Sequence, residues 1–242
     1  MKKKIRIKIF ADGADFVSMI KNNKLKHIDG FTTNPTLMRK AGVTNYVKFA
    51  KKVLKKIKKK PISFEVFTDN INEMEKQANE ISSWGSNVYV KIPVINTKGK
   101  NTLKLIKKLT DNNIKCNITA VFTLKQVKQI IETANKKTKV IISIFAGRIA
   151  DSGINPDPII KKAVRLSSKK NIEILWASTR EVFNVIQAKN VKCQIITIPE
   201  SILGKYKNLG KSIKDLNIET VKTFYKDAKK SGYKISRNLV LF

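Results

Sequence analysis

The 242-residue sequence has very little of the residues on which metal and thiol chemistry depends. It contains one histidine, His27, and two cysteines, Cys116 and Cys193. A lone histidine disfavours a histidine-based metal site and a cysteine–histidine relay. Both cysteines lie in apolar, strand-like runs, so we expect free, buried thiols in a reducing compartment. These scarcities predict a cytoplasmic protein that holds no metal ion.

Long hydrophobic runs and nucleotide-binding loops are also missing. Lysines at residues 2–4 resemble the start of a signal peptide, but residues 5–10 alternate between apolar and basic side chains and predict a strand instead. No run is long enough to span a membrane. Neither G-x-x-x-x-G-K-S/T nor G-x-G-x-x-G occurs. We therefore expect no membrane association and no phosphate loop.

Acidic residues are scarce as well, since 18 Asp and Glu stand against 50 Lys and Arg and give a formal net charge of +32. A charge of this size raises nucleic acid as a partner. However, only six of the basic residues are arginine, the lysines are spread along nearly the whole chain, and no nucleic-acid-binding motif accompanies them. We interpret the charge as a compositional bias and expect no nucleic-acid partner.

Short β-branched runs alternate with longer helical patterns along the chain. Eight strands alternating with helices imply parallel βαβ units, and the length is near the ~250 residues of a closed barrel. We predict an α/β fold, a single (β/α)8 TIM barrel, with an open doubly wound sheet as the alternative. The predicted strands are residues 5–12, 28–33, 62–67, 86–92, 114–120, 139–145, 171–177 and 193–198, and the helical segments include 44–59, 69–83, 99–112, 123–136, 156–168 and 179–188.

One additional C-terminal helix is predicted after the barrel, at about residues 217–232, followed by an extended tail. No linker, repeat or low-complexity segment divides the chain. We therefore expect one domain over residues 1–242, with the barrel at about 1–216 and the helix and tail at 217–242. The last helix is expected to cover a barrel end or a neighbouring subunit.

One lysine stands where a solubilising charge is not expected. Lys91 lies within residues 88–93, an apolar and β-branched run that predicts a buried strand closed by Pro93. A buried ammonium group is unfavourable unless it is paired or neutralised, and the neutral amine is a nucleophile. The position of Lys91 therefore predicts an enzyme that forms a Schiff base.

Polar residues also mark the ends of the other predicted strands. In a parallel barrel the active site lies at the C-terminal ends of the strands, where these side chains converge. Each also has a structural explanation, because Asp12 can form a turn, Asn34 can cap a helix that begins at Pro35, and the arginines can be surface charges. Besides Lys91, the candidates are Asp12, Asn34, Glu65, Asn117, Thr119, Ser143, Arg148, Ser178 and Arg180.

The segments around these residues resemble those of the transaldolase family over essentially the whole chain. The most specific are Thr-Thr-Asn-Pro at residues 32–35 and Gly-Arg-Ile-x-Asp at residues 147–151. The shared order and spacing strengthen the resemblance. The matching segments are residues 10–12 (FAD), 29–37 (DGFTTNPTL), 64–66 (FEV), 90–93 (VKIP), 116–119 (CNIT), 143–151 (SIFAGRIAD) and 177–180 (ASTR).

The resemblance implies a (β/α)8 enzyme of the pentose phosphate pathway that uses no metal or organic cofactor and moves a dihydroxyacetone unit between sugar phosphates. It makes Lys91 the Schiff-base lysine and Asp12 the group that takes the proton of the C4 hydroxyl. Glu65 and Thr119, with a bound water, would shuttle protons. The residues assigned to substrate binding are Asn34 and Asn117 on the three-carbon unit, Phe145, and Ser143, Arg148, Ser178 and Arg180 around the phosphate.

Several residues depart from the family pattern, and rival functions stay open. Gly13, Ile144 and Thr179 stand where Thr, Pro and an aromatic residue are common. Related fructose 6-phosphate/dihydroxyacetone aldolases typically carry Gln at the position of Glu65 and Tyr at that of Phe145, so these two residues favour transfer. The third possibility is an inactive basic barrel that binds anions or nucleic acid.

The resemblance also implies assembly into a homo-oligomer. Short members of the superfamily often form pentamer-based decamers through a C-terminal helix, whereas larger members form dimers. At 242 residues either a dimer or a pentamer-based decamer fits this chain.

Overall fold

Eight parallel strands close into a barrel in the order β1-β2-β3-β4-β5-β6-β7-β8. The computed structural model describes residues 6–168 and 171–235. The predicted (β/α)8 barrel is confirmed, and the open sheet is wrong because β1 also pairs with β8. The strands are β1 (Lys8–Asp12), β2 (Ile28–Thr32), β3 (Ile62–Glu65), β4 (Val88–Pro93), β5 (Cys116–Val121), β6 (Val140–Ile144), β7 (Ile172–Trp176) and β8 (Ile195–Pro199).

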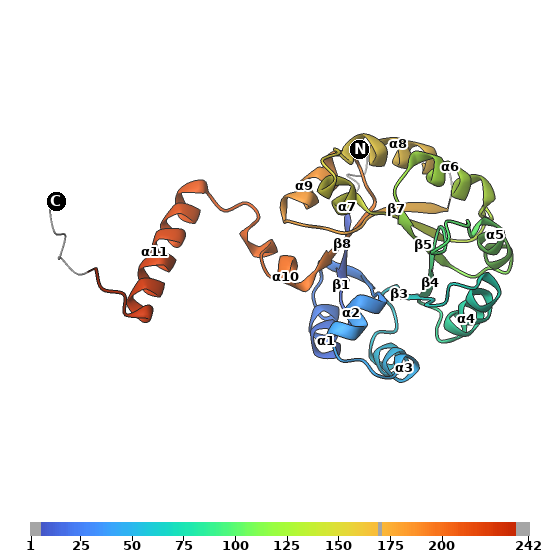
Figure 1. Cartoon of the computed structure of the whole chain (residues 1–242), viewed down its shortest axis with the longest axis horizontal. Helices are drawn as coiled ribbons and strands as arrows, with labels where there is room; N and C mark the ends of the chain where they lie inside the picture. Colours follow the sequence, from blue (N-terminus) through green and yellow to red (C-terminus); the bar gives the residue numbers. More distant parts are fainter. Residues whose placement is uncertain (1–5, 169–170, 236–242) are drawn as a thin grey trace. The chain divides into compact units, whose positions relative to one another are not determined.

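Helices surround the ring of strands (Figure 1). Their apolar faces are buried against the strands, as expected because both faces of a parallel sheet are normally covered. They are α1 (Phe16–Asn23), α2 (Pro35–Lys40), α3 (Tyr46–Lys56), α4 (Ile71–Ser83), α5 (Leu103–Asp111), α6 (Leu124–Thr133), α7 (Ala146–Asp151), α8 (Asp157–Ser167), α9 (Phe183–Asn190) and α10 (Glu200–Leu203). A short 3₁₀ turn, η1 (Tyr206–Asn208), and helix α11 (Ile213–Ser231) follow them in the chain.

Local sequence explains where several of these helices begin. The Thr123 hydroxyl accepts from the backbone N–H of Gln126, whose side chain in turn accepts from the Thr123 N–H, so α6 starts with a capping box. Helix α5 begins at Leu103, later than the predicted residue 99, because the preceding turn pairs Ile95 with Asn101. The short helix α7 was not predicted from the sequence.

The barrel interior is built in layers, because alternate residues of each strand point inward. One layer is apolar and buried, and contains Phe10, Tyr89, Ile141, Leu175 and Ile195; Ala177, two residues beyond Leu175, packs in the same apolar cluster. Two residues further along several of these strands, the inward side chains become polar. The buried members of this second layer are Thr32, Ser63, Lys91, Asn117, Ser143 and Thr197. A polar layer therefore lies on an apolar one, toward the C-terminal ends of the strands.

Among the described residues, those from Lys205 to Ile235 form a compact unit of their own, and the barrel unit extends to Gly204. Helix α11 dominates the second unit. The Ser212 hydroxyl accepts from the N–H of Asp215 at 3.0 Å, and this cap starts the helix at Ile213 instead of the predicted residue 217. No residue of α11 is buried. The expected tail at 236–242 and the start of the first predicted strand, Ile5, lie outside the described residues.

Candidate active site

Three candidate residues lie side by side across three neighbouring strands. The parallel register of β3 with β4 pairs Glu65 with Lys91, and that of β4 with β5 pairs Lys91 with Asn117. Residues at matching positions of adjacent strands point to the same face. The barrel therefore brings a carboxylate, an amine and an amide together in its polar layer.

Lys91 is buried, with 6% of its surface exposed, and both of its described contacts are to oxygen atoms. Its Nζ lies 3.1 Å from Glu65 Oε2 and donates to the Thr33 carbonyl at 3.0 Å. Pairing offsets the cost of burying the ammonium group. A carboxylate is thus in place to take a proton from the amine when the amine is required as a nucleophile.

Asp12 ends β1 and is linked to two threonines of neighbouring strands. Thr32 Oγ1 donates to Asp12 Oδ1 at 2.7 Å and is itself hydrogen-bonded to Thr197 Oγ1. Burial raises the pKa of Asp12 above its ordinary value of 3.8, the Lys91 ammonium and the Thr32 hydrogen bond lower it in part, and the Glu65 carboxylate raises it further. A carboxyl group with a raised pKa is suited to accept and return a proton.

The Asn117 side chain is held at both of its polar atoms. Its Nδ2 donates to Ser63 Oγ at 2.9 Å, and its Oδ1 accepts from Ser143 Oγ at 2.6 Å. All three side chains are buried. A buried amide that is satisfied on both sides has a fixed orientation. Ser143 therefore orients Asn117, and its predicted contact with a phosphate stays a prediction.

Thr119 is buried, and its hydroxyl has no hydrogen-bond partner among the residues that the structure describes. The next residue, Ala120, has a φ of 55°, a left-handed conformation that is unfavourable for a residue with a side chain. The pairing of β5 with β6 is irregular here, between Ile118 and Val121. A bulge of this kind redirects the neighbouring side chains and is typical of positions near active sites.

Asn34 lies where β2 ends and α2 begins. Its Oδ1 accepts from the backbone N–H of Leu37 at 2.9 Å, and Pro35 occupies the first helical position. The structural explanation considered for this residue, an N-cap, is therefore confirmed. The cap uses the oxygen of the side chain, and a role of its amide nitrogen in binding substrate stays a prediction.

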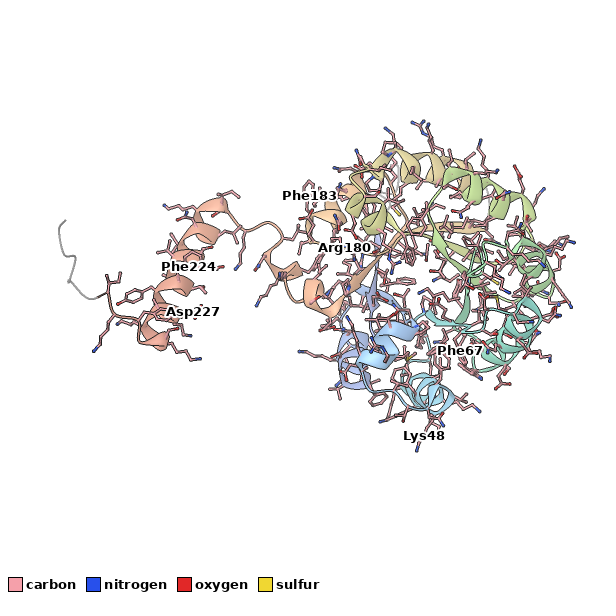
Figure 2. All side chains as sticks on the ribbon, viewed as in Figure 1. Lys48, Phe67, Arg180, Phe183, Phe224 and Asp227 are labelled. Atoms are coloured by element: carbon pink, nitrogen blue, oxygen red, sulfur yellow. The ribbon has the colours of Figure 1, made fainter. Side chains whose placement is uncertain are left out.

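The two candidate arginines are associated with one carboxylate, Asp151, at the end of α7. Arg180 Nε donates to the Asp151 carboxylate oxygens at 3.1 and 3.2 Å, and its Nη2 also binds Oδ2. The hydrogen bond from Arg180 lowers the pKa of Asp151, and the charges of Arg180 and Arg148 lower it further. Arg148 also lies over the ring of Phe145, with its Cζ 5.5 Å from the ring centroid. Figure 2 labels Arg180 on the barrel, close to Phe183 of α9.

Gly147 and Ser178 bring α7 against the end of β7. A Cβ atom on Gly147 would lie 1.6 Å from the Ser178 carbonyl oxygen, so only glycine fits at this position. The N–H of Gly147 donates to the carbonyl of Ala177 at 3.3 Å. Ser178 has a left-handed φ of 65°. This contact positions Arg148 and Arg180, which together form the arginine group. Within the described residues, no hydrogen bond or ion pair joins the arginine group directly to Lys91.

Several residues that build the site were not proposed from the sequence. Ser63 is two residues before Glu65 on the same strand face, so strand alternation was the available signal. Thr32 and Thr197 stand at strand ends, but small hydroxyl residues there are too common to be distinctive. Tyr46, at the start of α3, donates to the Glu65 carbonyl at 2.9 Å and fixes that end of β3.

Within residues 6–168 and 171–235, no group of three His, Cys, Asp or Glu side chains is arranged to hold a metal ion. Cys116 and Cys193 are free and buried, and burial raises the pKa of each thiol to about 12. Over the same part of the chain, every helix is too short or too polar to cross a membrane. The side chains of the site that can take part in nucleophilic or acid–base chemistry are therefore Lys91, Asp12 and Glu65.

The fold and the site define a class of protein. It is a (β/α)8 barrel in which a buried, carboxylate-paired lysine lies at the C-terminal ends of the strands, the end where barrel enzymes carry their active sites.

Known proteins narrow this class to one family. The sequence matches the family described as Transaldolase/Fructose-6-phosphate aldolase over residues 9–239. It is 34% identical to a probable transaldolase of Thermoplasma volcanium over 201 residues, 81% of this chain and 86% of the relative. Probable transaldolases of Brucella melitensis biotype 1 and Thermoanaerobacter sp. strain X514 are 33% and 32% identical over 232 and 231 residues, each 95% of this chain and 100% of the relative. The chain belongs to the transaldolase/fructose-6-phosphate aldolase family, and the predicted resemblance is confirmed.

Proposed function

We propose that the protein is a transaldolase of the pentose phosphate pathway that works through a Schiff base on Lys91. The donor would be sedoheptulose 7-phosphate or fructose 6-phosphate, and the acceptor glyceraldehyde 3-phosphate or erythrose 4-phosphate. Family membership supports a transaldolase-type enzyme. The observation that carries the covalent mechanism is the buried Lys91 amine, 3.1 Å from Glu65 Oε2 and in register with Asn117.

Formation of the Schiff base begins with a proton transfer from Lys91. The neutral amine attacks C2 of the ketose, and the carbonyl oxygen becomes a hydroxyl group on the resulting carbinolamine. Loss of water gives the iminium ion. In this proposal Glu65 takes the amine proton and returns it to the departing hydroxyl, and its 3.1 Å contact with the Lys91 amine supports the assignment. The Thr119 hydroxyl, buried without a partner in the described chain, can hold the water.

The carbon–carbon bond then breaks under the control of Asp12. Asp12 takes the proton of the C4 hydroxyl, the C3–C4 bond breaks, and its electron pair moves into the iminium to form an enamine. The aldose leaves as an aldehyde. The reverse steps on the acceptor aldehyde form the new bond, with Asp12 returning the proton, and water then releases the product ketose from Lys91. The raised pKa of Asp12 supports this acid–base role.

In this proposal the sugar phosphate is bound by the Asn117 amide and by Arg148 and Arg180. Asn117, fixed by its two serine partners, can bind hydroxyl groups of the three-carbon unit. Arg148 and Arg180 are suited to a phosphate because a guanidinium binds it through paired hydrogen bonds. Asp151 holds Arg180 through Nε and Nη2, and Nη1 makes none of these contacts. The mechanism uses no metal or organic cofactor.

An aldolase on the same scaffold is the second candidate. It would release dihydroxyacetone to water instead of passing it to an aldose. Glu65 and Phe145 favour transfer, since the related aldolases typically carry Gln and Tyr at these positions. An assay with fructose 6-phosphate, run with and without erythrose 4-phosphate, separates the two. Turnover that requires the aldose supports transfer, and equal release of dihydroxyacetone without it supports the aldolase.

Borohydride trapping tests the covalent step. The protein is incubated with fructose 6-phosphate and reduced, and its peptides are analysed by mass spectrometry. We expect one substrate adduct, on the peptide that contains Lys91. Absence of an adduct would overturn both enzyme functions and favour a barrel that only binds anions.

We also propose that the protein is cytoplasmic and forms a homo-oligomer. Sugar phosphates are intracellular anions, which favours the first statement. For the second, α11 carries exposed apolar side chains spaced by about one turn, including Ile218, Val221, Phe224 and Tyr225. Phe224 is 69% exposed and is labelled in Figure 2. A face of this kind favours packing against another copy of the chain.

A further inference from the structure

A cavity of about 540 Å³ opens at the end of the barrel opposite Lys91, where the strands begin. Its walls come from the first residues of β1, β6 and β7 and from the loops that precede β3, β4, β5 and β6. This volume lies within the range of small-molecule pockets, roughly 300–1,000 Å³. The N-terminal end of such a barrel is ordinarily concerned with stability, so a cavity of this size there calls for an explanation.

The floor of the cavity separates it from the active site. Phe10, Tyr89 and Ile141 line the cavity and belong to the apolar layer of the barrel interior. Asp12 and Lys91 lie two residues beyond Phe10 and Tyr89 on the same strands. A ligand in this cavity would therefore be held on the other side of an apolar layer from the lysine, and would not compete with substrate there.

The rim of the cavity carries an excess of positive charge. Both of its carboxylates already have cationic partners, because Glu173 pairs with Lys8 at 2.7 Å and Asp29 with Arg6 at 3.3 Å. The other lysines of the rim have no ion-pair partner within residues 6–168 and 171–235. These four lysines are Lys58, Lys59, Lys115 and Lys139.

Of these four lysines, Lys115 is the one that is partly buried, and the other three are exposed. The Lys115 Nζ donates to the Ser86 carbonyl and lies 5.5 Å from the centre of the Tyr89 ring. Burial lowers the pKa of Lys115, and the positive charge of Lys139 lowers it further. Two neighbouring ammonium groups that repel each other beside an apolar floor are stabilised by an anion between them.

We propose that this cavity binds a small phosphorylated anion with at least two negative charges, held between Lys115 and Lys139. Such a site would act independently of the transfer reaction. A small ligand fits the observations better than a nucleic acid, because the lysines converge on a closed-bottomed cavity instead of following an extended groove. Multiple negative charges are required because four rim lysines that have no ion-pair partner in the described part of the chain line the same cavity.

Pyrophosphate titration by calorimetry at constant ionic strength tests the proposal. The K115Q/K139Q variant is expected to bind pyrophosphate at least about tenfold more weakly, because two charge-assisted hydrogen bonds are lost. The control K104Q/K125Q removes two exposed lysines from α5 and α6 and is expected to bind within about twofold of wild type. The R148Q/R180Q variant separates this cavity from the arginine group and should retain the site.

Three outcomes would overturn the proposal. The first is that K115Q/K139Q binds pyrophosphate as tightly as wild type. The second is that R148Q/R180Q loses pyrophosphate binding while K115Q/K139Q retains it. The third is that the protein does not bind pyrophosphate but binds a single-stranded 20-nucleotide DNA through Lys115 and Lys139. A second measurement uses the unaltered protein and does not depend on the folding of variants. Pyrophosphate should protect Lys115 and Lys139, and not Lys104, from acetylation as read by mass spectrometry. Equal acetylation with and without pyrophosphate would contradict the proposal.

Discussion

The Nζ atom of Lys91 and the Oε2 atom of Glu65 lie 3.1 Å apart, although the two residues belong to different strands separated by a helix. The parallel register of β3 with β4 places them directly opposite each other. The same register places Asn117 on the other side of the lysine. An amine paired in this way is held in one orientation, with a carboxylate oxygen beside it.

Substitutions of Lys91 and of Asp12 are expected to block different steps of the reaction. Lys91→Arg should give no borohydride adduct and no turnover, because a guanidinium does not form the Schiff base. Asp12→Asn should still form the adduct but lower kcat by about 10²–10⁴-fold, the usual contribution of a general acid–base group. Lys104→Arg, on the exposed face of α5, is the matched control and should be fully active. An active Lys91→Arg protein would contradict the mechanism.

The activity should decline in acid at a pH above the ordinary value of an aspartate. Asp12 must be ionised to take the C4 proton, and its pKa is raised above 3.8, mainly by burial. We therefore expect kcat to fall as the pH drops through this raised pKa. The measurement is kcat against pH for wild type. An acidic limb centred at or below 3.8 would contradict the assignment.

The same shift predicts how Asp12 affects stability. Its folded pKa lies above its unfolded value, so the folded state binds more protons between the two values. The contribution of Asp12 is therefore most favourable below about 3.8 and is lost as the pH rises through the folded pKa. The isosteric Asp12→Asn variant should be more stable than wild type at pH 7, and the difference should disappear in acid. Urea unfolding at several pH values measures this, and a variant less stable at pH 7 would contradict it.

The serine pair around Asn117 should contribute to both stability and substrate binding. Ser63→Ala leaves the buried Asn117 Nδ2 without its acceptor, which should lower the free energy of unfolding by about 1–3 kcal/mol. The KM for the ketose phosphate should also rise, because the amide is no longer fixed. Ser83→Ala, at an exposed position of α4, should change the free energy by less than about 0.5 kcal/mol. Equal effects of the two substitutions would argue against the network.

Gly147 should not tolerate a side chain. In Gly147→Ala the new Cβ would meet the Ser178 carbonyl oxygen, so α7 or the end of β7 must move. We expect a loss of about 3 kcal/mol or more in the free energy of unfolding. The matched control is Gly13→Ala, where no atom lies within 4 Å of the added Cβ, and its effect should be within about 0.5 kcal/mol. Thermal and urea unfolding of both variants decide the point.

Helix α11 provides the test of assembly. Val221→Lys together with Phe224→Lys places charges on its exposed apolar face and should shift the protein toward monomers in analytical ultracentrifugation. Thr223→Lys adds a charge to the opposite face of the same helix and should leave the assembly unchanged. A wild-type protein that sediments as a monomer would contradict the proposed homo-oligomer.

Sequence patterns predicted the barrel well because the relevant signals are local. Runs such as Val140–Ile144 are β-branched and apolar at every position except Ser143, and amphipathic helical patterns separate them. The boundaries were less accurate. The starts of α5 and α11 depend on a turn pairing and on the Ser212 cap, which are interactions between specific groups and not periodic signals.

The sequence by itself determined that Lys91 lies in a buried strand and that polar residues follow the strands, because burial and alternation are recorded in consecutive residues. Only the tertiary structure decided which of them meet. The pairing of Lys91 with Glu65, the fixing of Asn117 by Ser63 and Ser143, and the Arg180–Asp151 contact all join segments far apart in the chain. Their partners are set by the register of a closed barrel, and register depends on the packing of the whole ring of strands.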